Sequence, residues 1–315
     1  MHNRRDFLAA SAAVAGSLAV AGRLPAAHFK TKIHKAMIGS PAEGTLKAWK
    51  DAGFDGMESG QWNISRQDAE KARKVAESVG MKIHSVLFGW ANFNQKDKVD
   101  GDIANVQRAL EAAAGYGASA VLLVPCRTGG MAIPAPWDFK IAFDSKTGHI
   151  SQVVAGDNEK YQAYIDAHNQ ATDTSREAVK RLIETAEKTG VKIALENVWN
   201  NLWVQPAIFA NFVRSFAHPM VKAYFDIGNH VKYAPPEEWI RALGKEIVKL
   251  HVKDFKLNAN GRDGTFVHPR DGSVNWPAVR TELDDIGYND FMTIEDGGLS
   301  LAEFSKRLDL IVAGK

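Results

Sequence analysis

The chain has 315 residues, of which 45% are hydrophobic and 24% are charged, and this composition is ordinary for a globular domain with one large core. The 39 lysines and arginines nearly balance the 37 aspartates and glutamates, so the formal net charge is only +2. Because the opposite charges nearly cancel, the chain lacks the strong basic field that would hold nucleic acid, and a small neutral ligand is favoured. The single cysteine, Cys126, excludes an internal disulfide and a metal cluster held by several thiolates.

The first 27 residues are predicted to be an export signal. Residues 3–8 read NRRDFL and precede an apolar, alanine-rich stretch to Ala21, a pattern that resembles a twin-arginine signal. Residues 19–21 offer a cleavage site, and the stretch is short and glycine-rich for a membrane span. An amphipathic N-terminal helix is the alternative, but no polar face runs between Leu8 and Ala21. We expect a mature domain over residues 28–315 that is periplasmic or otherwise extracytoplasmic, without a stable membrane span after signal removal.

From residue 32 onward, short β-branched runs alternate with longer helical periods, which is typical of parallel strands joined by helices. Most of these runs are almost entirely hydrophobic, as expected for strands that are buried on both faces. Glycines such as Gly80, Gly117 and Gly190 stand just before strands, where a left-handed residue ends a helix. We predict strands at residues 33–38, 53–58, 82–87, 118–124, 192–196, 223–226, 247–252 and 291–295. Eight strand–helix units predict an α/β fold, the (β/α)8 or TIM barrel.

Two predicted connections are too long to be plain turns, at residues 126–158 and 255–273. Both follow strands, so they leave the barrel at the carboxyl ends of its strands, the face called here the barrel mouth. Barrel enzymes build their sites there, and we expect both segments to overhang it. Within the first, residues 141–150 are predicted to form a β-hairpin with Gly148 in its turn.

Four consecutive predicted strands end in a single polar residue: Glu196, Asp226, His251 and Glu295. Neighbouring strands bring such side chains toward a common point at the barrel mouth. Taken alone, each is better explained by a salt bridge or a helix cap. Taken together, three carboxylates repel one another unless a cation holds them. Three oxygens and one imidazole suit Mn²⁺, Mg²⁺ or Co²⁺, with Zn²⁺ as an alternative, and we predict one such metal, Mn²⁺ first.

Six motifs connect the chain to a known family: GFDGME at 53–58, ALEN at 194–197, DIGN at 226–229, HVKD at 251–254, DGSVNW at 271–276 and GYNDFMTIE at 287–295. With these, residues 30–313 resemble the xylose-isomerase-like barrel superfamily, which includes sugar phosphate isomerases and epimerases, ketose 3-epimerases and hydroxypyruvate isomerases. The resemblance implies that Glu196, Asp226, His251 and Glu295 are the metal ligands. It also implies that Glu196 and Glu295 are the catalytic acid and base.

This assignment implies proton transfer next to a sugar carbonyl. The proton α to a carbonyl is weakly acidic, and its loss forms an enediolate that a metal ion stabilises. A carboxylate on each face of the substrate takes the proton from one side and returns it from the other, which inverts the carbon. Return of the proton to the neighbouring carbon moves the carbonyl instead, so the same site can isomerise.

Other polar and aromatic residues near the predicted strand ends are candidate substrate contacts: Glu58, His84, Trp199, Asn229, His230, Lys253 and Lys256. For Glu58 and His84, a structural hydrogen bond is an equal alternative. Lys253 and Asp254 are candidates for a pair that orients His251. Trp199 and Trp203 follow Glu196 and are placed to stack on a sugar.

Two departures from the family pattern leave the substrate open. Ketose 3-epimerases and hydroxypyruvate isomerases carry histidine three residues after the aspartate, where this chain has Asn229, with His230 one position later. An asparagine at this position resembles the pattern of the sugar-phosphate epimerase branch instead. The arginine that ketose epimerases place six residues beyond the histidine ligand is Leu257 here, with Lys256 beside it.

The leading interpretation is therefore an exported metal-dependent sugar isomerase or epimerase with a small carbohydrate substrate. A 3-keto-glycoside lyase or hydrolase is the first alternative, because the same enediolate can expel the aglycone. A non-catalytic sugar-binding barrel is the second alternative. The endonuclease IV branch is disfavoured, since it needs more strand-end histidines and a basic groove. Sugar phosphates are scarce outside the cytoplasm, which disfavours a phosphorylated substrate, and an oligomer is left open.

Overall fold

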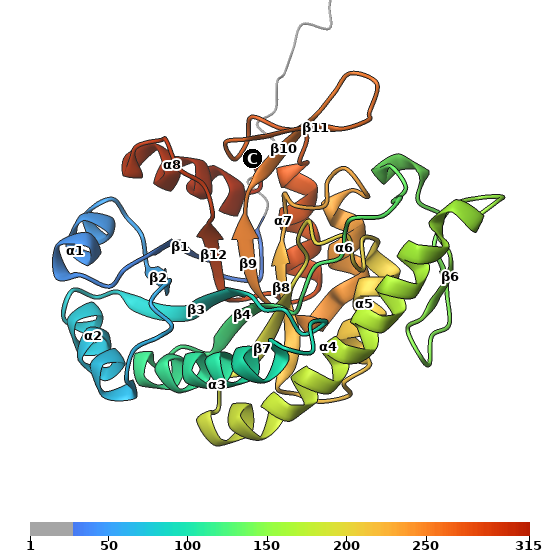
Figure 1. The fold of residues 1–315 in the computed structure, drawn as a ribbon. Helices are drawn as coiled ribbons and strands as arrows, with labels where there is room; N and C mark the ends of the chain where they lie inside the picture. Colours follow the sequence, from blue (N-terminus) through green and yellow to red (C-terminus); the bar gives the residue numbers. More distant parts are fainter. Residues whose placement is uncertain (1–27) are drawn as a thin grey trace, which may run out of the picture.

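Parallel strands form a closed barrel that helices surround (Figure 1). The computed structural model describes residues 28–315, so the predicted export signal at residues 1–27 lies outside the described part of the chain. Around the barrel the strands follow the order β1-β12-β9-β8-β7-β4-β3-β2, and neighbouring strands pair in parallel. The predicted (β/α)8 fold is confirmed.

The barrel strands follow the predicted hydrophobic runs. They are β1 His34–Gly39, β2 Gly56–Ser59, β3 Lys82–Trp90, β4 Ala120–Val124, β7 Lys192–Glu196, β8 Val221–Asp226, β9 Ile247–Val252 and β12 Phe291–Ile294. The second strand begins at Gly56 and not at the predicted Gly53. Gly53 has a φ of +89° and its N–H bonds the carbonyl of Lys50, so it belongs to the turn that ends the preceding helix.

The helices form the outer layer of the barrel. They are α1 Glu43–Asp51, α2 Arg66–Ser78, α3 Val99–Tyr116, α4 Gln162–Thr189, α5 Pro206–Arg214, α6 Pro236–Leu243, α7 Trp276–Asp285 and α8 Leu301–Val312, with 3-10 turns at Pro136–Asp138, Glu159–Tyr161 and Gly244–Glu246. Helices α2 and α3 pack very closely, because a Cβ on Gly115 would stand 2.3 Å from the carbonyl oxygen of Arg66. No helix in residues 28–315 has the length and apolar character needed to cross a membrane.

Two hairpins interrupt the strand–helix alternation, one in each long connection. The first pairs β5 Ala142–Phe143 with β6 Ile150–Gln152, and Gly148 turns with a φ of +71°, as predicted. It lies along the outside of α4, where Asn169 accepts a 2.7 Å hydrogen bond from the N–H of Ile150 (Figure 1). The expectation that all of residues 126–158 overhang the mouth is therefore wrong, because the hairpin part packs against the outer helices.

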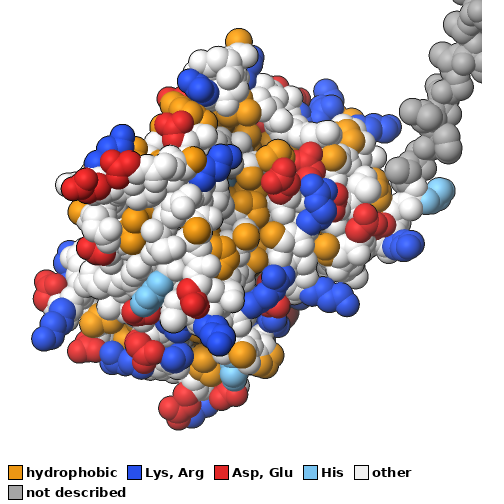
Figure 2. Space-filling view, turned by 90° about the vertical axis from the view of Figure 1, so that its right-hand side faces the viewer, with side chains coloured by type: hydrophobic (Ala, Val, Ile, Leu, Met, Phe, Trp, Pro, Cys, Tyr) orange, Lys and Arg blue, Asp and Glu red, His pale blue; other side chains and the backbone are white. Residues whose placement is uncertain are grey.

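The second hairpin pairs β10 Asp254–Leu257 with β11 Gly264–Val267 and projects from the end of β9 (Figure 1). Asp254 fixes its base by accepting hydrogen bonds from the N–H groups of Arg270, Gly272 and Val274 and from the indole of Trp276. The carboxylate thus ties both ends of residues 255–273 to the barrel. On the face shown in Figure 2, basic and acidic side chains are interspersed, without a continuous basic surface.

Candidate active site

Glu196, Asp226, His251 and Glu295 meet at the barrel mouth, each offering one ligand atom, and these atoms all lie within 4.8 Å of one another. Their positions follow from the strand order, because β7, β8, β9 and β12 are consecutive neighbours. Glu196 and Asp226 are the last residues of β7 and β8, and Asp226 is directly beside His251 in the register of β8 and β9. Glu295 follows β12, and its N–H bonds the carbonyl of Val252. The two glutamates therefore stand at the two ends of a four-strand arc.

The His251 imidazole lies at the centre of this cluster. Its Nδ1 is 3.2 Å from Oε1 of Glu196 and 2.7 Å from Oε2 of Glu295. Its Nε2 is 2.5 Å from Oε2 of Glu58, a fully buried carboxylate at the third position of β2. Glu58 thus holds the ring so that Nδ1 points at the other carboxylates. The expected substrate contact of Glu58 is corrected, because this side chain lies behind the histidine and away from solvent.

Burial and mutual repulsion perturb the carboxyl groups of the cluster. Burial raises the pKa of Glu196 to about 7 and that of Asp226 to about 6, and the nearby charge of Glu295 adds to both shifts. Burial acts on Glu295 as well, but His251 and Lys253 outweigh it and lower the pKa of Glu295 to about 2. Burial opposes the charge on His251, yet surrounding acidic groups such as Glu58 raise its pKa well above the ordinary range.

The donor set fits a divalent cation. Oδ2 of Asp226 and Oε2 of Glu295 are buried without a hydrogen-bond partner in residues 28–315, although such atoms are costly to leave unpaired. The 2.7 Å contact between Glu295 and Nδ1 of His251 lacks hydrogen-bond geometry, so it leaves Oε2 unsatisfied. Carboxylate oxygens with one imidazole nitrogen are ligands for Mn²⁺, Mg²⁺, Co²⁺ or Zn²⁺. One such ion at the common point would satisfy these atoms.

Two asparagines build the turn that carries Asp226. The Asn197 side chain accepts from the N–H of Asp226 at 2.7 Å and donates to its carbonyl at 2.8 Å. Asn229 donates from its Nδ2 to the carbonyl of Asn197, and its N–H bonds Oδ1 of Asp226 at 2.7 Å. Asn229 is therefore buried in the scaffold and not placed as the expected substrate contact. The ALEN motif contained Asn197, but sequence reasoning gave that residue no role.

Gly228 allows this turn to press against the next strand. A Cβ at this position would stand 2.6 Å from Cβ of Lys253 and 2.8 Å from its carbonyl carbon. The glycine of the DIGN motif therefore places Lys253 beside Asp226 and Glu295.

Two histidines expected to contact substrate lie elsewhere. His84 is near the start of β3, inside the barrel, where Nε2 is 3.0 Å from Oγ1 of Thr293 and the ring stacks on Phe291. His230 is buried, with Nε2 2.9 Å from the carbonyl of Val198 and its ring against Trp239. Both predictions are corrected, because His84 lies within β3 with its ring fully buried in the barrel, and the turn after β8 directs the ring of His230 into the core.

Lys253 reaches the cluster directly. Its Nζ is 2.8 Å from Oε1 of Glu295 and 3.5 Å from Oδ2 of Asp226. Burial disfavours its charge, but these carboxylates raise the pKa of Lys253. The expected pairing of Lys253 with Asp254 is wrong, because Asp254 binds the hairpin base instead. Lys253 is thus a fixed positive charge beside the candidate metal ligands.

Aromatic side chains surround the entrance to the cluster. The indole of Trp199 donates to the carbonyl of Asn229, and its ring lies 4.8 Å from Phe266 of β11. Trp199 and Phe266 are 36% and 43% exposed, and Lys256 is exposed on the same hairpin. Trp203, the other expected stacking residue, is buried and packs on Phe212. Of this pair only Trp199 is exposed, and Nζ of Lys232 lies 3.3 Å from the centre of its ring and covers one face.

The two long connections meet across the barrel mouth. Arg262, in the tip of the second, lies 5.6 Å above the ring of Trp137 in the first. The part of the first connection near Trp137 and the whole second hairpin therefore border the entrance, as predicted for these segments.

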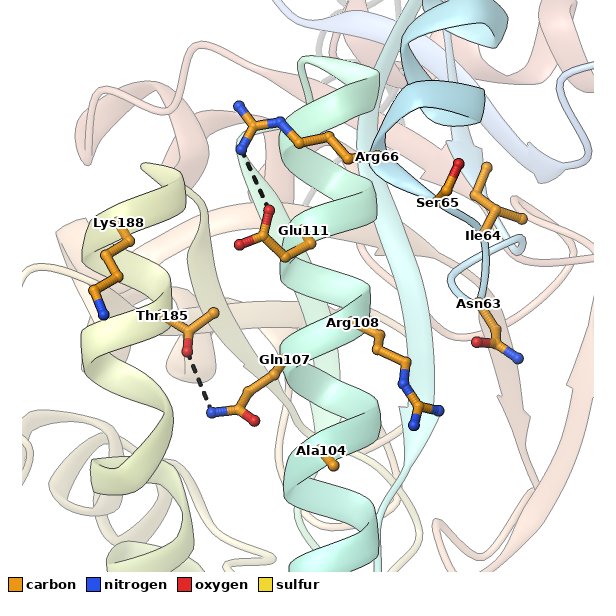
Figure 3. Close-up of a pocket in the computed structure, with 10 residues that line it drawn as sticks. All are labelled: Asn63, Ile64, Ser65, Arg66, Ala104, Gln107, Arg108, Glu111, Thr185 and Lys188. Atoms are coloured by element: carbon orange, nitrogen blue, oxygen red, sulfur yellow. Dashed lines mark hydrogen bonds and ion pairs between the residues drawn. The ribbon is translucent and has the colours of Figure 1, made fainter.

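A cavity of about 790 Å³ lies on the outer helical layer and does not contain the cluster (Figure 3). It is bordered by α2, α3 and α4, where Arg66 pairs with Glu111 and Gln107 donates to Thr185. None of the four strand-end residues lines it. The concentration of perturbed acidic groups makes the barrel mouth, and not this cavity, the candidate active site.

Comparisons with known proteins agree with this architecture. An uncharacterised protein of Methanocaldococcus jannaschii, MJ1311, is 27% identical over 146 residues, which is 44% of this chain and 48% of that protein. The match therefore spans about half the length of MJ1311.

Three solved structures share the fold. A zinc-containing IOLI protein superimposes with a TM-score of 0.66 at 17% identity, and a D-tagatose 3-epimerase-like protein with 0.62 at 19%; each match covers 89% of this chain and 98% of the other. The 3-keto-D-glucoside 4-epimerase of E. coli matches with 0.61 at 14% identity, covering 89% and 99%. The family model described as xylose isomerase-like TIM barrel matches residues 46–307. This chain belongs to the xylose isomerase-like TIM barrel family.

Proposed function

We propose that this protein is a divalent-metal-dependent sugar isomerase or epimerase that transfers a proton next to a carbonyl. The observation that carries the proposal is the convergence of Glu196, Asp226, His251 and Glu295 on one point at the barrel mouth. The similar structures named for ketose and keto-glucoside epimerases supply the reaction class. We take Mn²⁺ as the first candidate metal, because carboxylate oxygens dominate the donor set.

Glu196 and Glu295 would carry the proton. They flank Asp226 and His251 from the two ends of the four-strand arc, so their carboxylates approach a bound sugar from different sides. One accepts the proton from the carbon beside the carbonyl, and the other returns a proton to the opposite face or to the neighbouring carbon. A bound metal ion would supply positive charge for the oxygen that becomes negative.

Lys253 and the loop aromatics would complete the site. The ammonium of Lys253 adds a second positive charge beside Glu295 and can donate a hydrogen bond to a substrate oxygen. Phe266 offers an exposed ring for the apolar face of a sugar, and Trp199 borders it with one ring face covered by Lys232. A sugar-binding protein without catalysis has the same aromatic features, and the exchange experiment below separates the two functions.

Loss of either glutamate base is expected to stop turnover while leaving metal bound. In metal-loaded Glu196→Gln and Glu295→Gln variants, conversion of keto sugars to deuterium-labelled product in D₂O should fall by about 10² or more, since Gln keeps an oxygen ligand but not the base. Mass spectrometry follows the labelled product, and metal analysis checks occupancy. Glu238→Gln, in the first turn of α6, is the control. Wild-type protein that never exchanges any keto sugar would leave only the sugar-binding function.

Glu58 is expected to control metal affinity from behind His251. Glu58→Gln removes the charge that orients the imidazole, so the Kd for Mn²⁺ should rise by roughly 10- to 100-fold. Isothermal titration calorimetry measures this, and circular dichroism verifies the fold. Glu246→Gln, whose carboxylate pairs with Lys222, is the matched control. An unchanged Kd in Glu58→Gln would contradict the orienting role.

Metal binding is expected to strengthen as pH rises. The raised pKa values of Glu196, about 7, and Asp226, about 6, mean that protons occupy these groups at pH 5.5 and must leave when a cation binds. The Kd for Mn²⁺ should therefore fall by roughly tenfold or more between pH 5.5 and 7.5. Glu196→Gln should flatten this dependence. Calorimetry at both pH values decides, and equal wild-type affinities would oppose the idea.

We also propose that the protein acts outside the cytoplasm. The support is the NRRDFL segment and the apolar stretch behind it, within residues 1–27. Replacing both Arg4 and Arg5 with Lys should leave the protein in the cytoplasmic fraction of its host, since twin-arginine recognition depends on these guanidinium groups. Immunoblots of cell fractions measure this, with Arg23→Lys as the control. Unchanged export of the double variant would refute the assignment.

A further inference from the structure

Every exposed indole in residues 28–315 stands at the barrel mouth and lies against a cation. The three exposed tryptophans are at the end of β3, in the connection after β4 and in the connection after β7. Measured from the cation to the ring centre, the pairs are Arg127 with Trp90 at 4.1 Å, Lys232 with Trp199 at 3.3 Å and Arg262 with Trp137 at 5.6 Å. Arg127, Lys232 and Arg262 are called here the cationic rim.

The rim cations have no acidic partner. Among residues 28–315 no carboxylate lies within ion-pair distance of any of the three, whereas Arg181 of the outer layer pairs with Asp100 at 2.8 Å. Asp263 is close enough to influence Lys232 but too far away to pair with it. Lys232 is also half-buried, and this burial lowers its pKa. A half-buried ammonium without an acceptor in the described part of the chain is costly, so an added anion would be stabilised there.

The connections that carry the rim cations form one continuous border. The N–H of Thr128, next to the first rim cation, bonds the carbonyl of Asn200 at 3.0 Å and so joins the connections after β4 and β7. Trp199 precedes Asn200, and its ring lies 4.8 Å from Phe266 of β11. The loop between β10 and β11 carries Arg262. The three cations therefore surround the same opening.

This border reaches the candidate metal ligands on two paths. Phe266 lies 5.7 Å from Nζ of Lys253, which is 2.8 Å from Oε1 of Glu295. The indole of Trp199 donates to the carbonyl of Asn229, whose N–H bonds Oδ1 of Asp226 at 2.7 Å. A ligand held at the rim is therefore held beside the metal centre.

The chemistry of the rim favours a ligand with several negative groups. A cation occupies one face of each exposed indole, so the rim presents positive charge where a bare ring would bind a neutral sugar. Guanidinium groups bind carboxylates with two parallel hydrogen bonds. Because the three cations stand on different connections, a chain with repeated acid groups can meet more of them than a single small acid can.

We propose that the cationic rim binds the carboxylate groups of acidic sugar chains, so that the site prefers acidic to neutral carbohydrates. This inference rests on the proposed function for the choice of a sugar, because the rim surrounds the centre proposed to act on one. It departs from the neutral ligand expected from the balanced net charge, since net charge does not describe the local distribution at the mouth.

Calorimetry with a matched pair of trisaccharides tests the rim. The pair is α-1,4-trigalacturonate and its neutral methyl ester, titrated into metal-loaded wild type freed of excess metal. The acid should bind about tenfold or more tightly than the ester, and raising the salt concentration from about 0.05 M to about 0.5 M should weaken only the acid. Each of Arg127→Gln, Lys232→Gln and Arg262→Gln should lower the ratio of acid to ester affinity by about two- to fivefold, and the triple variant by about tenfold.

A triple variant of the outer helices controls for net charge. Arg108→Gln, Arg181→Gln and Lys188→Gln together remove the same charge from α3 and α4, and Arg108 and Lys188 face the outer cavity (Figure 3). This control should keep the preference of wild type for the acid, and circular dichroism verifies both folds. An equal loss in the control and the rim variant would overturn the proposal, as would equal affinity of wild type for acid and ester.

Two further ligands decide the kind of occupant. D-Galacturonate should bind about tenfold more weakly than the trimer, and equal affinity would refute a rim that acts through several cations. A single-stranded oligothymidylate that bound as tightly as the trimer would refute the assignment to sugar acids. These measurements need no turnover, so they remain decisive if wild type converts no keto sugar and the proposed function fails.

Discussion

The site depends on bringing three carboxylates and one imidazole together in a buried space. Burial and mutual repulsion raise the pKa values of Glu196 and Asp226, and the positive charges of His251 and Lys253 offset the negative charge. The Glu58–His251 bond fixes where the imidazole points. Barrel closure supplies the rigid frame for this arrangement, because each acidic group stands on or directly after a different strand. Under the proposed function, a bound cation would offset the repulsion within this cluster and would therefore add to the stability of the fold.

Much of this arrangement could be predicted from the chain itself. The eight strands were readable because buried parallel strands are hydrophobic throughout, and the ligands stood out because each is a lone polar residue at the end of such a run. Strand order then follows from chain order in a barrel, so the sequence indicated that Glu196, Asp226, His251 and Glu295 are neighbours. The hairpin was also predicted, at residues 141–150 with Gly148 in its turn, and the structure pairs Ala142–Phe143 with Ile150–Gln152.

The remaining features depend on contacts between distant segments, which leave no local pattern. Glu58 bonds a ring 193 positions later, so its role as a support for His251 could not be read from β2. His230 was predicted to contact substrate, but the turn held by Asn197 and Asn229 directs its ring into the core. Asp254 was predicted to pair with Lys253 because the two are adjacent in the chain. Its carboxylate oxygens instead accept hydrogen bonds from backbone N–H groups of the loop.

The contact between Arg262 and Trp137 determines how easily the two loops at the entrance separate. An exposed cation–π contact stabilises by only about 0.5–1 kcal/mol, close to thermal energy at room temperature. Asp254, by contrast, holds the base of the same hairpin with several hydrogen bonds. The tip can therefore separate from the opposite loop on the timescale of loop motion while its base stays in place. Opening of this bridge would therefore add only a small barrier to passage through the entrance.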